Sequence, residues 1–189
     1  MSSLKRIHIY GHVSAQPQAI ANLFDAQLAS EIVAESDLAI FAINPAAGID
    51  QKTIDQWQAL SDFQLPRLVV VNELDGSDAD FEDAIMLANR VFDQLVTPFL
   101  VLHSESGSPI ALISLSDLQI IDYSTKPPTI SASEPEHQEL VSEFREEYLE
   151  EIAGSGENAF AAGLLFPAIP IVISNGLGID VVKSYIAQL

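Results

Sequence analysis

Short apolar runs alternate with longer amphipathic stretches along most of the chain. Four runs have the pattern of buried strands: Ile7–Tyr10, Leu38–Ile43, Leu68–Val71 and Ile169–Ile173. The last three are continuously apolar, which is typical of parallel strands that are buried on both faces. Helical periodicity occupies segments between them, at about 19–34, 53–63 and 81–95. This alternation predicts an α/β fold with a mainly parallel sheet and right-handed crossovers.

The segment Thr97–Tyr123 departs from this pattern. Its apolar runs are short and are separated by a turn rich in serine and glycine, so they predict two or three antiparallel strands. The stretch that follows, STKPPTISASEPEH, has no periodicity and is expected to be a surface loop. A short helix at 159–165 and a terminal helix after the last strand complete the prediction.

A strongly acidic helix is predicted from Pro135 to Gly154. Its apolar stripe repeats every four residues, and a capping box between Ser133 and Glu136 is expected at its start. The segment Glu134–Glu157 contains nine glutamates and one arginine. A solvated helix face explains such a run. The same run also suits the docking of a basic partner, because complementary charge speeds association.

Composition narrows the function classes. Eight lysines and arginines against 27 aspartates and glutamates give a formal net charge of −19, so direct binding of nucleic acid is not expected. The lack of cysteine excludes disulfides, thiolate catalysis and zinc–thiolate sites. No apolar run approaches the roughly 18 residues that span a bilayer, and the N-terminus does not have the pattern of a signal peptide. We therefore expect a soluble cytoplasmic protein without membrane contact.

The first strand leads through Gly11 towards a helix, which is where a nucleotide-binding protein has its phosphate loop. That loop has the form G-x-x-x-x-G-K-[ST], and the corresponding stretch here is GHVSAQPQ. Gln16 stands for the second glycine, Pro17 for the lysine and Gln18 for the hydroxyl residue. The loop itself therefore lacks the cation, and proline also removes a backbone N–H. These changes argue against the binding of a triphosphate.

The third buried strand ends in VVVNELD. Asn72 and Asp75 have the spacing of the N-K-x-D motif with which GTPases read guanine, although Glu73 takes the place of the lysine. An Asn-x-x-Asp sequence alone often forms only a turn. Its position directly after a buried strand favours the functional interpretation.

Taken in order, these segments resemble the guanine-nucleotide domain of elongation factor G. The likeness is closest in AINPAAGID, LPRLVVVNELD and DADFEDAI, and VISNGLGIDVVKSYIAQL is similar to the family's final base-binding loop and helix. The resemblance implies a three-layer α/β fold like that of P-loop GTPases, with residues 1–96 and 166–189 as the core. It also implies a small α+β insertion at residues 97–165. The residual guanine-nucleotide positions are then Gly11, Asn72, Asp75 and Ser174.

The chain departs from that family in one long stretch. Between Phe24 and Leu38 we expect one helix and nothing else, whereas the family places both switch regions there, including the histidine that positions water. An alternative alignment sets YGHV against the Pro-Gly-His-Val of the second switch. It would make His12 the water-positioning residue and leave no phosphate loop.

The first hypothesis is a binding or regulatory protein related to translation that does not hydrolyse nucleotide and carries no cofactor. The alternative is a GTP-binding protein, either a GTPase or a weak binder of GTP or GDP through its base-reading residues. By resemblance, the acidic segment Glu134–Glu157 faces a protein partner, with the ribosomal stalk or another translation factor as candidates. No metal site is predicted: the acidic run ELDGSDADFED lacks the EF-hand frame, and its carboxylates suit a helix N-terminus.

Overall fold

The structure is a computed structural model that describes residues 3–75 and 80–189. Its centre is a six-stranded sheet of order β2-β1-β3-β4-β10-β5, in which every pair of neighbouring strands is parallel. The strands are β1 (Ile7–Gly11), β2 (Gln27–Leu28), β3 (Leu38–Ile43), β4 (Arg67–Val71), β5 (Leu95–Val96) and β10 (Phe166–Pro170). Three of the four predicted buried strands are confirmed to within one residue.

The fourth strand lies a few residues earlier than predicted. β10 ends at Pro170, although the apolar run continues to Ile173. Ile171 N–H still donates to the carbonyl of Val71 at 2.9 Å, but Val172 then pairs in antiparallel fashion with Leu177. The apolar run therefore contains both the end of a strand and the start of the turn that follows it.

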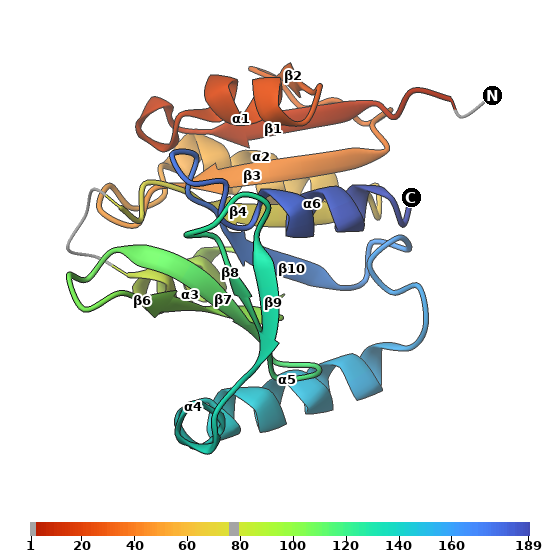
Figure 1. Ribbon diagram of the computed structural model, residues 1–189. Coiled ribbons are helices and arrows are strands. Elements are labelled where there is room, and N and C mark those ends of the chain that lie inside the picture. Colours follow the sequence, from red (N-terminus) through yellow and green to blue (C-terminus); the bar gives the residue numbers. More distant parts are fainter. Residues whose placement is uncertain (1–2, 76–79) are drawn as a thin grey trace.

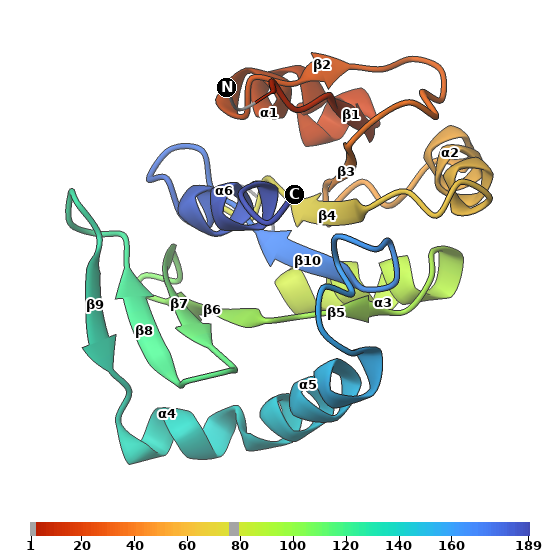
Figure 2. The same cartoon turned by 90° about the vertical axis from the view of Figure 1, so that its right-hand side faces the viewer.

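Helices cover both faces of the sheet (Figures 1 and 2). α2 (Gln51–Ser61) and α3 (Phe81–Val91) lie on one face, and α6 (Ile179–Ile186) lies on the other. A short 3-10 helix, η1 (Val13–Ala15), joins β1 to α1 (Pro17–Leu23). The arrangement is the three-layer α/β fold that the sequence predicts.

The first helix is much shorter than its apolar pattern suggests. α1 ends at Leu23, and Asp25 has a φ of 51°, which turns the chain back along the sheet. β2 then pairs with β1, and Ala29 N–H donates to the carbonyl of Ile9 at 2.9 Å. The expectation of a helix to about residue 34, with nothing else before Leu38, is therefore wrong.

Four antiparallel strands form a second sheet of order β6-β7-β8-β9. They are β6 (Phe99–His103), β7 (Pro109–Ser114), β8 (Gln119–Asp122) and β9 (Thr129–Ala132). The first three confirm the predicted antiparallel segment. β9 lies in the stretch expected to be a loop, and all four of its residues are exposed. An exposed strand has no buried positions to give it an apolar pattern, so its sequence does not reveal it.

The acidic helix is divided into α4 (Pro135–Leu140) and α5 (Ser142–Ser155), which meet at the buried residue Val141. The capping box predicted at its start does not form. Glu134 occupies the N-cap position, and the Ser133 hydroxyl instead accepts a 3.2 Å hydrogen bond from the Gln138 side chain. The helix is interrupted at Val141, whose backbone angles (φ −102°, ψ 4°) lie outside the helical range.

The helix predicted at 159–165 is a series of turns. Asn158 has a φ of 59°, and Gly163 has a φ of 72° and packs against the backbone of Gln64. A Cβ atom at position 163 would lie 2.2 Å from the carbonyl oxygen of Gln64. The segment thus turns tightly to pass the end of α2 before it enters β10.

Apolar side chains of both sheets form one cluster that includes Phe41 of β3 and Leu112 of β7. In its centre Tyr10 stacks on Phe41 with ring centroids 4.9 Å apart, and Trp57 stacks on Phe92 at 4.4 Å. The division into a core and an inserted subdomain at residues 97–165 stays a prediction. Within the described ranges, no helix is both long and apolar enough to cross a membrane.

Candidate functional site

The candidate residues follow the carboxyl ends of three parallel strands. Gly11 ends β1, Asn72 follows β4, and Ser174 follows β10. Because these strands run in the same direction, their carboxyl ends meet at one edge of the sheet, which is where ligands of open α/β sheets bind.

Gly11 is required by the close approach of two strands. It has a φ of 149°, and a Cβ atom there would lie 2.6 Å from the carbonyl oxygen of Ala42 in β3. An L side chain fits neither this backbone conformation nor this space. A glycine at the end of β1 therefore has a structural reason independent of any ligand.

The loop after Gly11 uses its backbone N–H groups internally. The N–H of Ser14 donates to the Nδ1 atom of His12 at 3.2 Å, and those of Ala15 and Gln16 donate to carbonyls of the same loop at 3.0 Å each. Pro17, the next residue, has no N–H to offer. Three consecutive amides that could face an anion are therefore engaged within the turn.

Two asparagines hold this loop from the neighbouring strands. Asn72, which is buried, donates its side-chain amide to the carbonyl of Ala15 at 3.0 Å. Asn44, at the end of β3, donates in the same way to the carbonyl of Ser14 at 2.9 Å. The asparagine of the N-K-x-D-like motif thus holds the loop after β1.

The base-reading positions lie together. The hydroxyl of Ser174 donates a 3.0 Å hydrogen bond to the Oδ2 atom of Asp75, and both residues are exposed. Glu73, between Asn72 and Asp75, has a φ of 62°, and its carboxylate accepts a hydrogen bond from the side-chain amide of Gln16. The loop after β1 and the loop after β4 are therefore joined by their side chains.

An open hollow of about 570 Å³ lies beside the first loop. Its lining includes Gly11, Gln16, Pro17, Leu28 and Lys52. The lysine is a cation that sequence reasoning missed, because it comes from the first turn of α2 and not from the phosphate-loop pattern. No local signal marks it: only the packing of α2 beside β1 brings it to the hollow.

Two residues of the acidic run ELDGSDADFED, Asp80 and Asp83, cap the N-terminus of α3. The carboxylate of Asp80 accepts the N–H of Asp83 at 2.9 Å, and Asp83 accepts the N–H of Asp80 at 3.4 Å, which completes a capping box. Asp78 lies outside the described residues. Among residues 3–75 and 80–189, no three or more His, Asp or Glu side chains gather to hold a metal ion.

His12, the alternative water-positioning residue, is exposed. Its ring accepts a hydrogen bond from the backbone N–H of Ser14 within the same turn.

Comparisons with known proteins agree with this architecture. The chain is 30% identical over 164 residues to proteins of two Mycobacterium tuberculosis strains called elongation factor G-like protein, which covers 76% of this chain and 23% of theirs. It is 29% identical over 86 residues to mitochondrial ribosome-releasing factor 2 of Anopheles gambiae, covering 45% of this chain and 12% of that protein. A crystal structure from Thermus thermophilus matches with a TM-score of 0.71 and 22% identity, over 82% of this chain and 26% of that one. No family model matches.

The fold and the arrangement of its loops define a protein of the G-domain-like α/β class. The chain is a homologue of elongation factor G-like proteins and resembles the G domain of elongation factor G, as the sequence predicts. It spans 23% of the length of the Mycobacterium relatives that it matches.

Proposed function

We propose that the chain is a protein-binding relative of elongation factor G that acts in translation and does not hydrolyse nucleotide. The observation that carries this proposal is the closed state of the first loop. Its amides at positions 14, 15 and 16 bond within the loop. In a phosphate loop, converging backbone N–H groups form the nest that holds the phosphates.

Local charge supports the same conclusion. Glu73 places a carboxylate next to Gln16, the residue that stands for the second glycine of the phosphate loop. Lys52 is a cation on the rim of the hollow, but the whole chain has a formal net charge of −19. Phosphoryl groups are held in such proteins mainly by positive charge and metal ions, so a triphosphate gains little at this edge of the sheet.

The second candidate function is GTP or GDP binding through the base alone. The hydrogen bond between Ser174 and Asp75 favours it, because it aligns two positions that the resemblance assigns to guanine. The contact from Asn72 to Ala15 favours it as well, since it fixes the loop beside them. Binding of this kind depends on the purine and is insensitive to the number of phosphates.

Isothermal titration with GDP and GTP, each with Mg²⁺, separates these functions. We expect no measurable heat from the full chain. Heat that is independent of phosphate number, lost in Asp75→Ala and kept in the control Asp55→Ala, supports base recognition. Tight Mg²⁺-dependent binding with phosphate release overturns the proposal.

The proposed partner surface is the acidic pair of helices α4 and α5. It carries exposed carboxylates such as Glu146 and Glu150, which attract a basic protein surface. The ribosomal stalk or another translation factor is the partner that we propose by resemblance. Binding of purified stalk protein is expected to weaken in Glu146→Lys/Glu150→Lys. The control Glu31→Lys/Glu35→Lys makes the same change of net charge on exposed residues elsewhere, and an equal loss in both variants contradicts this surface.

A further inference from the structure

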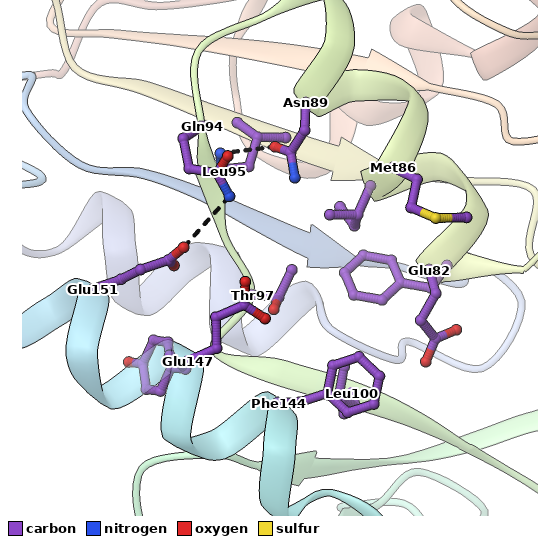
Figure 3. A pocket seen from close by; sticks show the side chains of 13 residues that line it. Glu82, Met86, Asn89, Gln94, Leu95, Thr97, Leu100, Phe144, Glu147 and Glu151 are labelled. Atoms are coloured by element: carbon purple, nitrogen blue, oxygen red, sulfur yellow. Dashed lines mark hydrogen bonds between the residues drawn. The ribbon is translucent and has the colours of Figure 1, made fainter.

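A hollow of about 330 Å³ lies between α3 and α5, beside β5 and the start of β6 (Figure 3). It is distinct from the loops at the carboxyl edge of the sheet. Ile85 and Met86 face it from α3, and Phe144, Glu147 and Tyr148 face it from α5. The spacing of three and four residues puts Phe144, Glu147 and Tyr148 on one side of α5.

The hollow exposes apolar side chains that have no cover. Met86 is 59% exposed and Phe144 is 42% exposed, and beneath them Phe81 and Leu100 are buried. None of the residues of α5, all of which the structure describes, is fully buried. The apolar stripe of this helix therefore packs only partly against the rest of the protein. Its exposed residue Phe144 lines the hollow. Large apolar side chains gathered around a concavity mark a surface that contacts another molecule.

Carboxylates surround this apolar floor. Glu82 comes from α3, and Glu147 and Glu151 come from α5 (Figure 3). Of the described residues that line the hollow, none is a lysine, arginine or histidine. Glu151 accepts a 3.4 Å hydrogen bond from Gln94.

Partial burial makes the charged form of Glu82 and Glu151 less favourable than it is in water. Burial raises the pKa of Glu82 and of Glu151, and the negative charge of Glu147 raises the pKa of Glu151 further. An arriving cation relieves this cost, because an opposite charge nearby favours the ionised carboxylate. The hollow thus combines an apolar floor with a rim that is complementary to positive charge.

We propose that this hollow receives an amphipathic helix of a partner protein, with an apolar residue against Met86 and Phe144 and with lysines or arginines beside the three glutamates. Helices bind in grooves in this way, with apolar anchors three or four residues apart. The inference rests on the protein-binding function proposed above, and it specifies the chemistry of the partner's surface. It adds a second contact, in the hollow between α3 and α5, to the one proposed for the outer face of the acidic helices.

A synthetic helical peptide of leucines and lysines, labelled for fluorescence anisotropy, tests this directly against the full chain. We expect saturable binding that weakens as salt is raised, since the rim charges are screened. A matched peptide with glutamate in place of lysine should not bind. Absence of binding by the lysine peptide, or equal binding by both peptides, overturns the inference.

Paired variants locate the binding surface. Phe144→Ala removes an anchor in the hollow, whereas Leu140→Ala removes an exposed apolar side chain of α4 that does not line it. Glu147→Lys reverses a rim charge, whereas Glu143→Lys makes the same change on an exposed residue of α5 outside the lining. The first member of each pair is expected to weaken binding about tenfold, as loss of an interface anchor does, and the control much less. If both variants of a pair weaken peptide binding equally, the peptide does not bind in the hollow between α3 and α5.

The two proposals fail in different experiments. If the peptide does not bind but stalk protein still depends on Glu146 and Glu150, the groove is wrong and the acidic-surface function stands. If Mg²⁺ and GTP bind tightly, the proposed function is wrong whatever the peptide does. Thermal unfolding of each variant confirms that it is folded before binding is compared.

Discussion

The side-chain amide of Asn72 and the carbonyl of Ala15, 57 positions apart in the chain, are joined by a buried hydrogen bond of 3.0 Å. It fixes the turn after β1 to the end of β4. Any ligand that binds at this edge of the sheet contacts a loop whose position is fixed by the residue that follows β4. The bond therefore determines the shape of the candidate site as well as the stability of the fold.

Asn72→Ala should destabilise the protein by about 1–3 kcal/mol, because it leaves the Ala15 carbonyl without its buried partner. The free energy of unfolding in urea measures this loss. Asn22→Ala is the control, since Asn22 is exposed on α1 and surface changes usually stay within about 0.5 kcal/mol. Similar losses in both variants would contradict a special role for the buried amide.

A buried arginine of β4, Arg67, lies against two aromatic rings, one from α2 and one from β10. Arg67 is 2% exposed, and its guanidinium lies 4.2 Å from the ring centroid of Trp57 and 4.4 Å from that of Phe166. Its Nη2 atom is 3.6 Å from a carboxylate oxygen of Asp93, which also accepts the indole N–H of Trp57 at 2.9 Å. One carboxylate therefore serves both a buried cation and a buried N–H donor.

Asp93→Ala is expected to cost about 3 kcal/mol, since the indole N–H of Trp57 loses its acceptor and Arg67 loses its counter-charge while both stay buried. The matched control is Asp37→Ala, which breaks the exposed ion pair with Arg6, 3.4 Å apart. Exposed pairs contribute about 0–1 kcal/mol. Guanidinium chloride unfolding compares the two, and a smaller effect for Asp93→Ala than for Asp37→Ala would refute the assignment.

The partly buried carboxylate of Glu82 should make stability depend on pH. Burial raises its pKa above the ordinary value of 4.5, so its ionisation is easier in the unfolded chain. The resulting cost is present at pH values above the folded-state pKa and disappears as the pH falls towards 4.5. Glu82→Gln should therefore be more stable than the wild type at pH 7, with the difference shrinking at lower pH.

Urea midpoints at neutral and acidic pH measure this change. The control Glu150→Gln alters an exposed carboxylate of α5 and should shift stability by less than about 0.5 kcal/mol throughout. A Glu82→Gln variant that is less stable than the wild type at pH 7 would show that the carboxylate is held favourably in its charged form.

A tyrosine connects the second sheet to the last helix. The hydroxyl of Tyr123, which is buried, donates a 2.5 Å hydrogen bond to the carboxylate of Asp180 in α6. Tyr123→Phe should cost about 1.5–3 kcal/mol, the range for hydrogen bonds to charged groups. Tyr185→Phe, whose ring packs on Phe160, is the control in thermal unfolding. Equal stability of Tyr123→Phe and the wild type would rule out the connection.

The apolar pattern predicts the central strands because they are buried on both faces. The bounds of β3 are reproduced in full, since all six of its residues are buried. The same pattern does not predict elements whose bounds are set by backbone turns or whose residues are exposed. α1 ends at Leu23, two residues before the left-handed residue Asp25, and no glycine marks this turn. The exposed strand β9 has no apolar periodicity at all.

The candidate site divides in the same way. Asn72 and Asp75 are visible in the sequence because they follow a recognisable apolar strand, whereas Ser174 is assigned by the family resemblance. Lys52 and the hollow between α3 and α5 are not visible, because they depend on how helices pack against each other and against the sheet. No spacing along the chain records that packing.

The shared apolar cluster has a consequence for how the molecule opens. Within the described residues, side chains of both sheets belong to one continuous cluster, so separating the antiparallel sheet would expose apolar surface on the parallel one. Such coupling favours melting as a single cooperative unit, with equal calorimetric and van't Hoff enthalpies. Contacts made by a partner at the α3–α5 hollow would then protect the whole cluster, including the carboxyl edge of the sheet, against unfolding.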